Sequence, residues 1–201
     1  MRADSPWRRP DGHERRRLGT RRRIYEAALD EFRRVGFEAA GISRIARRAG
    51  VSRPSFYFHF PTKQHVLLEL QWELEHEVAG RIASTQAPGA ALHAFVDELV
   101  EAEDRVGRGD LFRDLLQVWV RPPPSVDRQA HEMPVVVAVR ARFEQAAAAG
   151  VLRADVPPDR ATLLFLTGVF GYLLGVAGDA SDERENLHAL VDLYVGPDRS
   201  G

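Results

Sequence analysis

The stretch from residue 42 to residue 60 combines hydroxyl, cationic and aromatic side chains at a spacing suited to DNA contact. Its first part, ISRIARR, places apolar residues three and four positions apart, which predicts a helix with one buried face. Gly50 permits the left-handed backbone that follows a helix end, and the Ser52 hydroxyl can cap a second helix. Phe56 and Phe60 lie four residues apart and are expected to pack inward. The pattern predicts a helix-turn-helix whose second helix faces outward.

The outward side of that second helix is expected to carry Arg53, Ser55, Tyr57 and His59. An arginine can form two hydrogen bonds to a guanine, a contact that gives about 1–3 kcal/mol of discrimination against other bases. Ser55 is too short to specify a base alone, and Tyr57 could instead be a rim residue packed against Phe60. Because paired short helices also occur in bundles that bind no nucleic acid, the charge of the surrounding chain bears on the interpretation.

The charge of the chain is divided between its two ends. Residues 1–65 contain 15 Arg and one Lys against seven acidic residues, whereas residues 66–201 contain 12 Arg against 22 acidic residues. A basic segment of this kind is typical of proteins that bind the phosphates of nucleic acids, and an acidic body would be repelled by the same duplex. The charge distribution therefore favours DNA binding by the N-terminal part.

A set of residues within the segment 20–70 carries a resemblance to a known family: Ala27, Ala28, Phe32, Gly36-Phe37, Ile45-Ala46, Ala49-Gly50-Val51-Ser52, Tyr57, His59-Phe60 and Lys63. With these residues the segment resembles the DNA-binding domain of the TetR family of transcriptional regulators. The resemblance implies a three-helix DNA-binding domain, followed by a larger helical domain that binds a ligand and dimerises. Gly41 departs from the pattern, because the family usually has a Ser or Thr cap there and Gly caps a helix slightly less well.

The resemblance also implies which side chains meet DNA. Tyr57 and Lys63 are expected on phosphates, and Arg53 is a candidate for a base edge. These residues do not define the operator sequence, because one arginine reads one base pair at most. The full predicted interface consists of Ser43, Arg44, Ser52, Arg53, Pro54, Ser55, Tyr57, His59 and Lys63.

Residues 1–19 are expected to form a disordered basic arm, because proline, glycine and clustered arginine leave no apolar core. One interpretation of this arm is a solvated tail. The other is an arm that becomes ordered along or in the minor groove of DNA, and the two interpretations are compatible. The predicted organisation is an arm over 1–19, a helix-turn-helix domain over 20–65 and a helical effector-binding and dimerisation domain over 66–201.

Beyond Pro61 the spacing of apolar residues predicts helices throughout, so the expected fold class is all-α. Prolines and glycines mark the breaks between these helices. One of them is started or interrupted by Pro134 and continues to Gly150. The other expected helices span residues 62–84, 90–106, 110–120, 158–177 and 182–195.

An uncharged run over residues 161–178 is at the lower length limit for crossing a bilayer. Its glycines and threonines, and the lack of a basic cluster beside it, favour a helix buried between the body and a partner subunit. In the TetR family the last two helices of each chain form a four-helix bundle across a two-fold axis. The residues expected at this homodimer interface are Gly168, Gly171, Gly175, Leu187 and Leu190.

A dimer also suits DNA, since two recognition helices about 34 Å apart can enter successive major grooves of a palindromic operator. Aromatic side chains from several expected helices could line a pocket for a small apolar or amphipathic effector. Each of these side chains could instead pack in the core. The predicted lining is Trp72, Phe95, Phe112, Trp119, Phe143 and Phe165.

Other functions find less support in the sequence. The absence of cysteine excludes disulfide frameworks and thiolate chemistry. His76-Glu77 and His131-Glu132 begin like a zinc-protease motif, but no histidine follows at the fifth position. A helical adaptor that binds protein and a small helical enzyme are the alternatives. The favoured prediction is a cytoplasmic, homodimeric, ligand-responsive repressor of transcription, with no catalytic residue, no cofactor and no metal ion.

Overall fold

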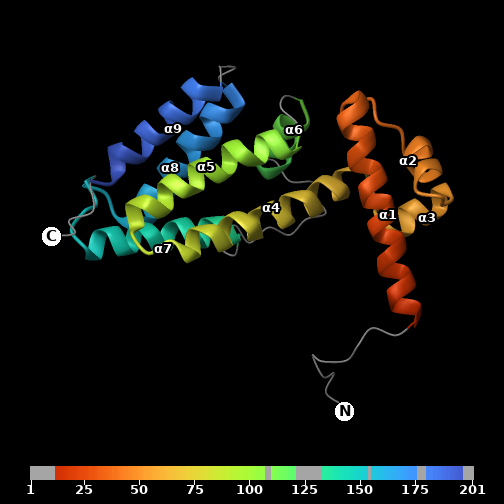
Figure 1. Ribbon diagram of the computed structural model, residues 1–201, viewed down its shortest axis with the longest axis horizontal. Coiled ribbons are helices and arrows are strands. Elements are labelled where there is room, and N and C mark those ends of the chain that lie inside the picture. The colour runs from red at the N-terminus through yellow and green to blue at the C-terminus, as the bar shows by residue number, and fades with distance from the viewer. Residues whose placement is uncertain (1–11, 107–109, 121–132, 154, 176–179, 197–201) are drawn as a thin grey trace, which may run out of the picture. The chain divides into compact units, whose positions relative to one another are not determined.

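The computed structural model describes residues 12–106, 110–120, 133–153, 155–175 and 180–196, with only the backbone of residues 110, 118–120, 180 and 181. In these ranges the regular elements are helices, joined by turns (Figure 1). The chain divides into two compact units, with the boundary between Val66 and Leu67. The all-α fold class expected from the sequence is confirmed.

The N-terminal unit contains α1 (Gly12–Val35), α2 (Ile42–Arg48) and α3 (Arg53–His59). α2 packs against both α1 and α3. Each helix turns one face inward, because its apolar residues recur three and four positions apart. The side chains buried between the helices include Ile24, Ala28, Phe32, Phe37, Ile45, Ala46, Phe56 and Phe60.

α1 begins earlier in the chain than the sequence predicts. A disordered arm is expected over residues 1–19, but residues 12–19 are the start of α1. Their side chains are exposed, so tertiary packing does not hold this part of the helix. Arginine is a good helix former, and a helix already nucleated by its buried part extends at little cost. The expectation of disorder is therefore wrong for residues 12–19, and residues 1–11 lie outside the described part of the chain.

α4 (Gln64–Ser84) starts in the N-terminal unit and continues into the C-terminal one. The bounds of the following helices lie within a few residues of the expected ranges, because proline marks three of their starts. Pro88, Pro134 and Pro158 are each the first residue of a helix. The C-terminal unit continues with α5 (Pro88–Val106), α6 (Asp110–Val120), α7 (Pro134–Ala148), α8 (Pro158–Gly175) and α9 (Ala180–Tyr194).

Aromatic rings form the centre of the C-terminal unit. Phe165 of α8 contacts Phe95 of α5, Phe143 of α7 and Tyr194 of α9, with ring centres 5.8, 5.6 and 5.9 Å apart. α5 packs against α7 and α9, and α8 packs against the same two helices. The aromatic cluster therefore joins the four helices in one core.

α8 covers most of the uncharged run and has two different sides. It buries Phe165, Leu166 and Val169 within the unit, whereas Leu163 and Leu164 are exposed. Among the described residues, no helix combines the length and the apolar character needed to cross a membrane.

Candidate nucleic-acid interface

The turn between α2 and α3 is built from backbone hydrogen bonds and one hydroxyl cap. Gly50 has a φ of 67°, in the left-handed region. The N–H of Val51 donates to the Ala46 carbonyl at 2.9 Å. The Oγ of Ser52 accepts a hydrogen bond from the Ser55 N–H at 3.3 Å. These contacts satisfy backbone groups that helix ends leave open, and they fix where α3 begins.

α3 has one buried and one exposed side. Phe56 and Phe60 are both 0 % exposed, so the opposite side of the helix is turned to solvent. Arg53, Pro54 and Tyr57 are exposed there, and Arg53 Nη2 lies 3.5 Å from Tyr57 Oη. A guanidinium and a phenol hydroxyl are thus adjacent, and both can donate hydrogen bonds. Such a surface can bind phosphates and base edges.

Phe58 is an exposed aromatic residue of α3 that the sequence analysis leaves out of the interface. Its side chain is 75 % exposed, and its ring centre lies 5.1 Å from that of His59. The helical repeat indicates that Phe58 is exposed, because position 58 lies about 200° around the helix from the buried Phe56. An exposed phenylalanine on this side can contact the methyl group of thymine.

A hollow of about 430 Å³ lies between α2, α3 and the start of α4. Lys63 lies in its wall, and its Nζ donates to the carbonyls of Phe37 at 2.7 Å and Glu38 at 2.9 Å. The same ammonium lies 4.4 Å from the centre of the Phe37 ring. The side chain is therefore held in position by the loop that follows α1. The lining residues are Ala40, Gly41, Ile42, Ser43, Arg53, Tyr57, Pro61, Thr62, Lys63 and Gln64.

Arg44 connects α2 to α1. Its Nε donates to the buried carboxylate of Glu31 at 2.5 Å, and its Nη2 donates to the Ala39 carbonyl at 2.7 Å. Arg34 also pairs with Glu31, at 2.9 Å. The hydrogen bond from Arg44, opposed by burial and supported by Arg34, holds the pKa of Glu31 below its ordinary value of 4.5. The geometry gives Arg44 a positioning role between the two helices, where the sequence analysis expects a DNA contact.

His59, the last residue of α3, lies beside the basic start of α1. Arg21 donates to the backbone carbonyl of His59, and its guanidinium lies 4.1 Å from the centre of the Phe60 ring. Burial, together with the charges of Arg21 and Arg17, lowers the pKa of His59 below its ordinary value of 6.5. The N-terminal part of α1 and the end of α3 are thus neighbours on one surface.

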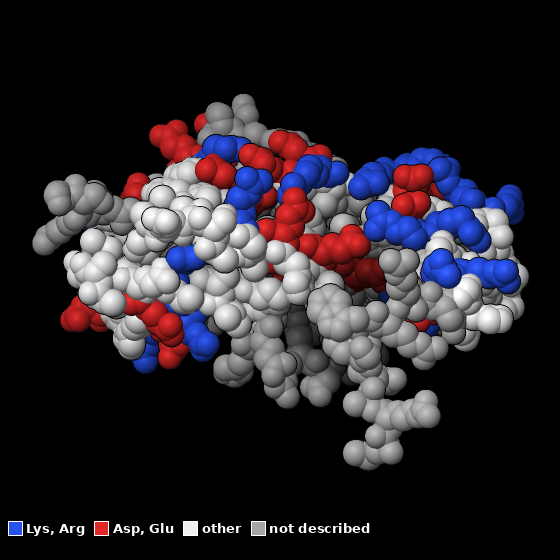
Figure 2. All heavy atoms as spheres, turned by 60° about the horizontal axis from the view of Figure 1, so that its bottom comes forward, with Lys and Arg blue, Asp and Glu red and all other residues white. Residues whose placement is uncertain are grey.

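The charges in Figure 2 differ between the two units. On the face shown, the charged side chains of the N-terminal unit are mostly Lys and Arg, whereas those of the C-terminal unit are a mixture of acidic and basic side chains. A concentration of cations attracts the phosphates of a duplex. Among the described residues of the N-terminal unit, the exposed arginines are Arg15, Arg16, Arg17, Arg22, Arg23, Arg33, Arg34, Arg44, Arg47, Arg48 and Arg53.

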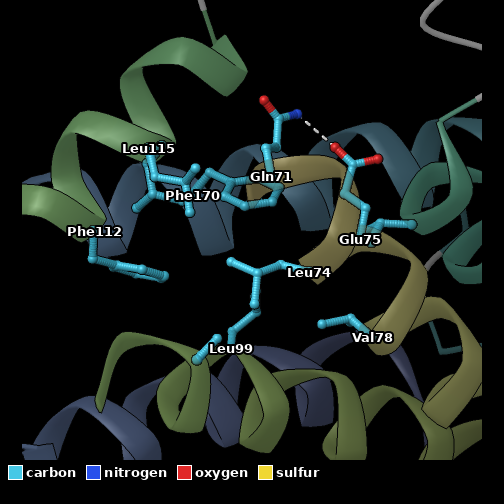
Figure 3. Close-up of a pocket in the computed structure, with 11 residues that line it drawn as sticks. Gln71, Leu74, Glu75, Val78, Leu99, Phe112, Leu115 and Phe170 are labelled. Carbon is cyan, nitrogen blue, oxygen red and sulfur yellow. Dashed lines mark hydrogen bonds between the residues drawn. The ribbon is translucent and has the colours of Figure 1, made fainter. Parts of the chain in front are cut away.

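The C-terminal unit contains a cavity of about 40 Å³. Figure 3 shows Leu74 of α4, Leu99 of α5 and Phe112 of α6 around it. Gln71 and Glu75 lie at one side, where Gln71 Nε2 donates to Glu75 Oε1 at 2.6 Å. A space of this size can hold water, so a larger ligand requires the cavity to widen. The lining consists of Gln71, Leu74, Glu75, Val78, Leu99, Ala102, Phe112, Leu115, Leu116, Val135 and Phe170.

The aromatic residues expected in a pocket have different surroundings in the structure. Phe112 lines the cavity. Phe95, Phe143 and Phe165 are fully buried and pack against one another in the core, so they do not line this cavity.

Trp72 lies outside the cavity as well. It is 62 % exposed, and its ring centre lies 3.8 Å from that of His76. α4 turns Gln71 and Glu75 toward the cavity, and residue 72 lies about 100° around the helix from residue 71. This rotation explains why Trp72 is not part of the lining. The side chain of Trp119 lies outside the described residues.

The residues expected at a dimer interface also differ in their surroundings. Leu187 is fully buried within its own chain, which removes it from any surface. A Cβ at Gly168 would lie 3.0 Å from Leu190 Cδ2, so these residues contact each other between α8 and α9 of one chain. Gly171 and Gly175 are exposed. The large exposed apolar residues of these two helices are Leu163, Leu164 and Leu193, which the sequence analysis leaves out.

A helix-turn-helix with a cationic exposed face, joined to a separate helical unit, is the architecture of a DNA-binding regulator of transcription. Residues 24–70 match the family model described as "Bacterial regulatory proteins, tetR family". This part of the chain is a TetR-family DNA-binding domain, as the resemblance over residues 20–70 implies.

Similar proteins cover nearly the whole chain. The transcriptional repressor AcnR of Corynebacterium diphtheriae is 28% identical over 184 residues, which are 90% of this chain and 92% of AcnR. The structure of Thermus thermophilus FadR, a TetR-family repressor in complex with lauroyl-CoA, is 27% identical with a TM-score of 0.65 and covers 90% and 98% of the two chains. AibR, in complex with isovaleryl coenzyme A and operator DNA, has the same fold with a TM-score of 0.61 at 17% identity, over 87% and 99% of the chains.

Proposed function

We propose that this protein is a repressor that binds a palindromic operator as a homodimer and releases it when a small molecule enters the C-terminal unit. The observation that carries the proposal is the exposed side of α3, where Arg53 and Tyr57 lie beside the hollow that Lys63 lines. The similarity to AcnR, which is named a repressor, supports repression. Binding to chromosomal DNA implies action in the cytoplasm.

The proposed DNA contacts follow from what each side chain offers. Arg53 would read a guanine edge, because its planar guanidinium can form two parallel hydrogen bonds. Tyr57 and Lys63 would bind phosphates at the hollow, and Phe58 would contact a thymine methyl. Further contacts are proposed for Ser43, Ser52, Pro54, Ser55 and His59, which belong to or flank α2 and α3.

The proposed dimer uses the exposed sides of α8 and α9. Leu163 is 66% exposed and Leu193 is 70% exposed, so covering them with a second copy would remove apolar area from water. Gly171 would let a helix of the second copy approach α8 closely, since a Cβ at this position would meet no atom of its own chain within 4 Å. Replacing Leu163 and Leu193 together by Arg should give a folded monomer by analytical ultracentrifugation. A variant that remains dimeric would contradict this interface.

The proposed effector is a small apolar or amphipathic molecule that widens the cavity between α4, α5, α6, α7 and α8. Support comes from the almost wholly apolar lining and from FadR and AibR, whose structures hold acyl-CoA compounds. α4 contributes Gln64 to the hollow and Leu74 to the cavity. A shift of α4 on ligand binding would therefore reach a residue of the proposed DNA-binding surface.

Selection from a random DNA library, followed by fluorescence anisotropy on the enriched sequence, tests the proposal. The expected result is a palindromic sequence whose half-sites are centred about 34 Å apart, one helical turn of DNA, or a multiple of it. Affinity should fall steeply as the salt concentration rises, because bound phosphates release their counterions. Enrichment of no sequence above the starting library would contradict sequence-specific binding.

A further inference from the structure

Two polar side chains of α4, Gln71 and Glu75, lie in the wall of the cavity in the C-terminal unit. Each is only 8 % exposed, although glutamine and glutamate usually lie on the surface of a protein. The other nine residues of the described lining are apolar. Polar groups are costly to bury unless they are hydrogen-bonded, so the bonds of these two side chains indicate what the cavity can accept.

The hydrogen bond between the two side chains fixes the orientation of the Gln71 amide. Gln71 Nε2 donates to Glu75 Oε1 at 2.6 Å. The reverse orientation would place the amide oxygen against a carboxylate, which only accepts hydrogen bonds. The amide nitrogen therefore faces Glu75, and Figure 3 shows the amide oxygen on the side away from Glu75.

The amide oxygen of Gln71 is a buried acceptor that lacks a donor. Among the described residues, no group donates a hydrogen bond to Gln71 Oε1. The rest of the described lining cannot supply the donor, because its side chains other than Glu75 are apolar. A buried acceptor without a partner is unfavourable, so a molecule that enters the cavity binds more tightly if it brings a donor.

We propose that the effector is a mainly apolar alcohol or phenol whose hydroxyl group donates a hydrogen bond to Gln71 Oε1. This proposal rests on the effector site proposed above. One neutral O–H suits one such acceptor, whereas an ammonium group has three hydrogens to place and a charge to bury. An ether or an ester brings acceptors only, so its oxygen would face Gln71 Oε1 with no hydrogen between them.

Glu75 acts as a positioning residue in this proposal. Its carboxyl group accepts from Gln71 Nε2 and so holds the amide with Oε1 on the other side. Gln71 and Glu75 are four residues apart on one helix, which places them on the same face of α4. The selectivity of the cavity for a hydroxyl group is thus built into a single helix.

Two pairs of isomers test the proposal, because the members of each pair have the same atoms and differ in whether the oxygen carries a hydrogen. They are n-hexanol with methyl n-pentyl ether, and para-propylphenol with para-ethylanisole. Isothermal titration of the full-length protein without DNA measures their binding. In at least one pair the hydroxyl compound should bind about tenfold or more tightly than the ether. Affinities that favour the hydroxyl in neither pair, including no binding at all, would overturn the proposal.

The variant Q71M removes the acceptor and keeps a side chain of similar length. The two isomers should then bind within about threefold of each other, because neither can form the hydrogen bond. The matched control is Q145M, since Gln145 is exposed on α7 and its Oε1 accepts from Arg142 Nη1 at 2.6 Å. Q145M should keep the preference of the wild type, and circular dichroism verifies that both variants are folded. A folded Q71M with the full preference for the hydroxyl would contradict the proposal.

The variant E75Q tests the positioning role of Glu75. A glutamine at this position can either accept from Gln71 or donate to it, so the Gln71 amide is able to adopt both orientations. The preference for the hydroxyl compound should fall severalfold while binding persists. An unchanged preference in a folded E75Q would contradict the positioning role.

Release of DNA is measured separately, by anisotropy with the operator and the hydroxyl compound. Release at the concentrations that saturate the cavity would support both the selectivity and the regulatory function. A compound that binds with the expected preference but leaves the operator bound would support the selectivity for a hydroxyl and contradict the regulatory function. Operator binding without any preference for the hydroxyl would overturn the selectivity alone.

Discussion

Arg53 and Lys63 both belong to the proposed DNA surface, but they differ in what holds them. Arg53 is exposed, and its neighbour is the Tyr57 hydroxyl. Lys63 donates to two carbonyls of the loop that follows α1. The difference predicts separable effects of the two side chains on specificity, affinity and stability.

Replacing Arg53 by Ala should lower operator affinity by about 1–3 kcal/mol and relax the preference at one base pair. Lys63 to Ala should weaken every duplex, reduce the salt slope by about one unit and also lower the free energy of unfolding by about 1 kcal/mol, because two hydrogen bonds are lost. Anisotropy on operator and random DNA, with denaturation curves, measures these effects. Equal loss on all sequences for the Arg53 variant would exclude base contact.

Glu31 predicts a pH dependence of stability. The pKa of Glu31 is lowered in the folded protein. Its contribution to the free energy of unfolding is therefore complete above about pH 4.5 and is lost as the pH falls through the lowered value. Glu31 to Gln should remove this pH-dependent part and lower the free energy of unfolding at neutral pH by about 1–3 kcal/mol. Urea denaturation between pH 3 and pH 7 measures it. Glu26 to Gln is the control, since Glu26 forms an exposed pair with Arg22.

At the residue scale, the sequence predicts which side of a helix faces outward better than it predicts what each side chain binds. The inward positions of Phe56 and Phe60 follow from their spacing, and both are buried. The partner of Arg44 does not follow, because Glu31 lies on another helix and comes close only through folding. Trp72 is expected in a pocket because aromatic side chains from several helices could converge there, but the direction of its side chain depends on a rotation of about 100° per residue.

At the scale of elements, the turn between α2 and α3 depends on Gly50. A Cβ there would meet no atom within 4 Å, but the φ of 67° is unfavourable for any residue with a side chain. Gly50 to Ala should therefore lower the free energy of unfolding by about 1 kcal/mol and weaken operator binding. Gly19 to Ala is the matched control. Gly19 lies in the exposed first part of α1, and its replacement by Ala should stabilise the protein by about 0.5–1 kcal/mol. Urea denaturation compares them, and equal changes would contradict the role of the turn.

The basic start of α1 lies beside the end of α3, as the contact of Arg21 with His59 indicates. Replacing Arg15, Arg16 and Arg17 by Gln should leave the fold unchanged, since these side chains are exposed. The slope of log affinity against log salt should become less steep by about two to three units. The control changes Arg140, Arg153 and Arg160 to Gln, an equal loss of charge in the C-terminal unit. Equal slopes for the two variants would show that only net charge matters.

Proline helps to predict helix starts, because the ring both stops the preceding helix and suits the first turn of the next. The start of α8 at Pro158 is predicted correctly, α5 begins at Pro88 where the sequence predicts residue 90, and Pro134 starts α7, which is one of the two possibilities left open. The start of α1 is predicted poorly for the opposite reason. Its arginines form a helix without burying an apolar face, so no hydrophobic period reveals it.

For the whole molecule, the regulatory proposal predicts reciprocal coupling between ligand and DNA. A ligand that weakens operator binding must itself bind the operator complex more weakly by the same factor. Leu74 to Trp should fill the cavity and abolish the response to such a ligand while DNA binding survives, because Leu74 lies in the lining. Trp72 to Ala should keep the response, since Trp72 points to solvent. Anisotropy with and without ligand measures both, and a responsive, folded Leu74 variant would refute this cavity as the effector site.

Lys63 is the single lysine of the sequence. Its amine lies in the hollow between α2, α3 and α4, where it contacts two backbone carbonyls. Acylating reagents that attack side-chain amines therefore have one target in this chain, and that target belongs to the surface proposed for phosphate. Neutralising it would remove a cation and its hydrogen bonds in one step. Lys63 can therefore serve as a site for chemical footprinting. A bound duplex should protect its amine from acylation, and acylation should in turn prevent binding of the duplex.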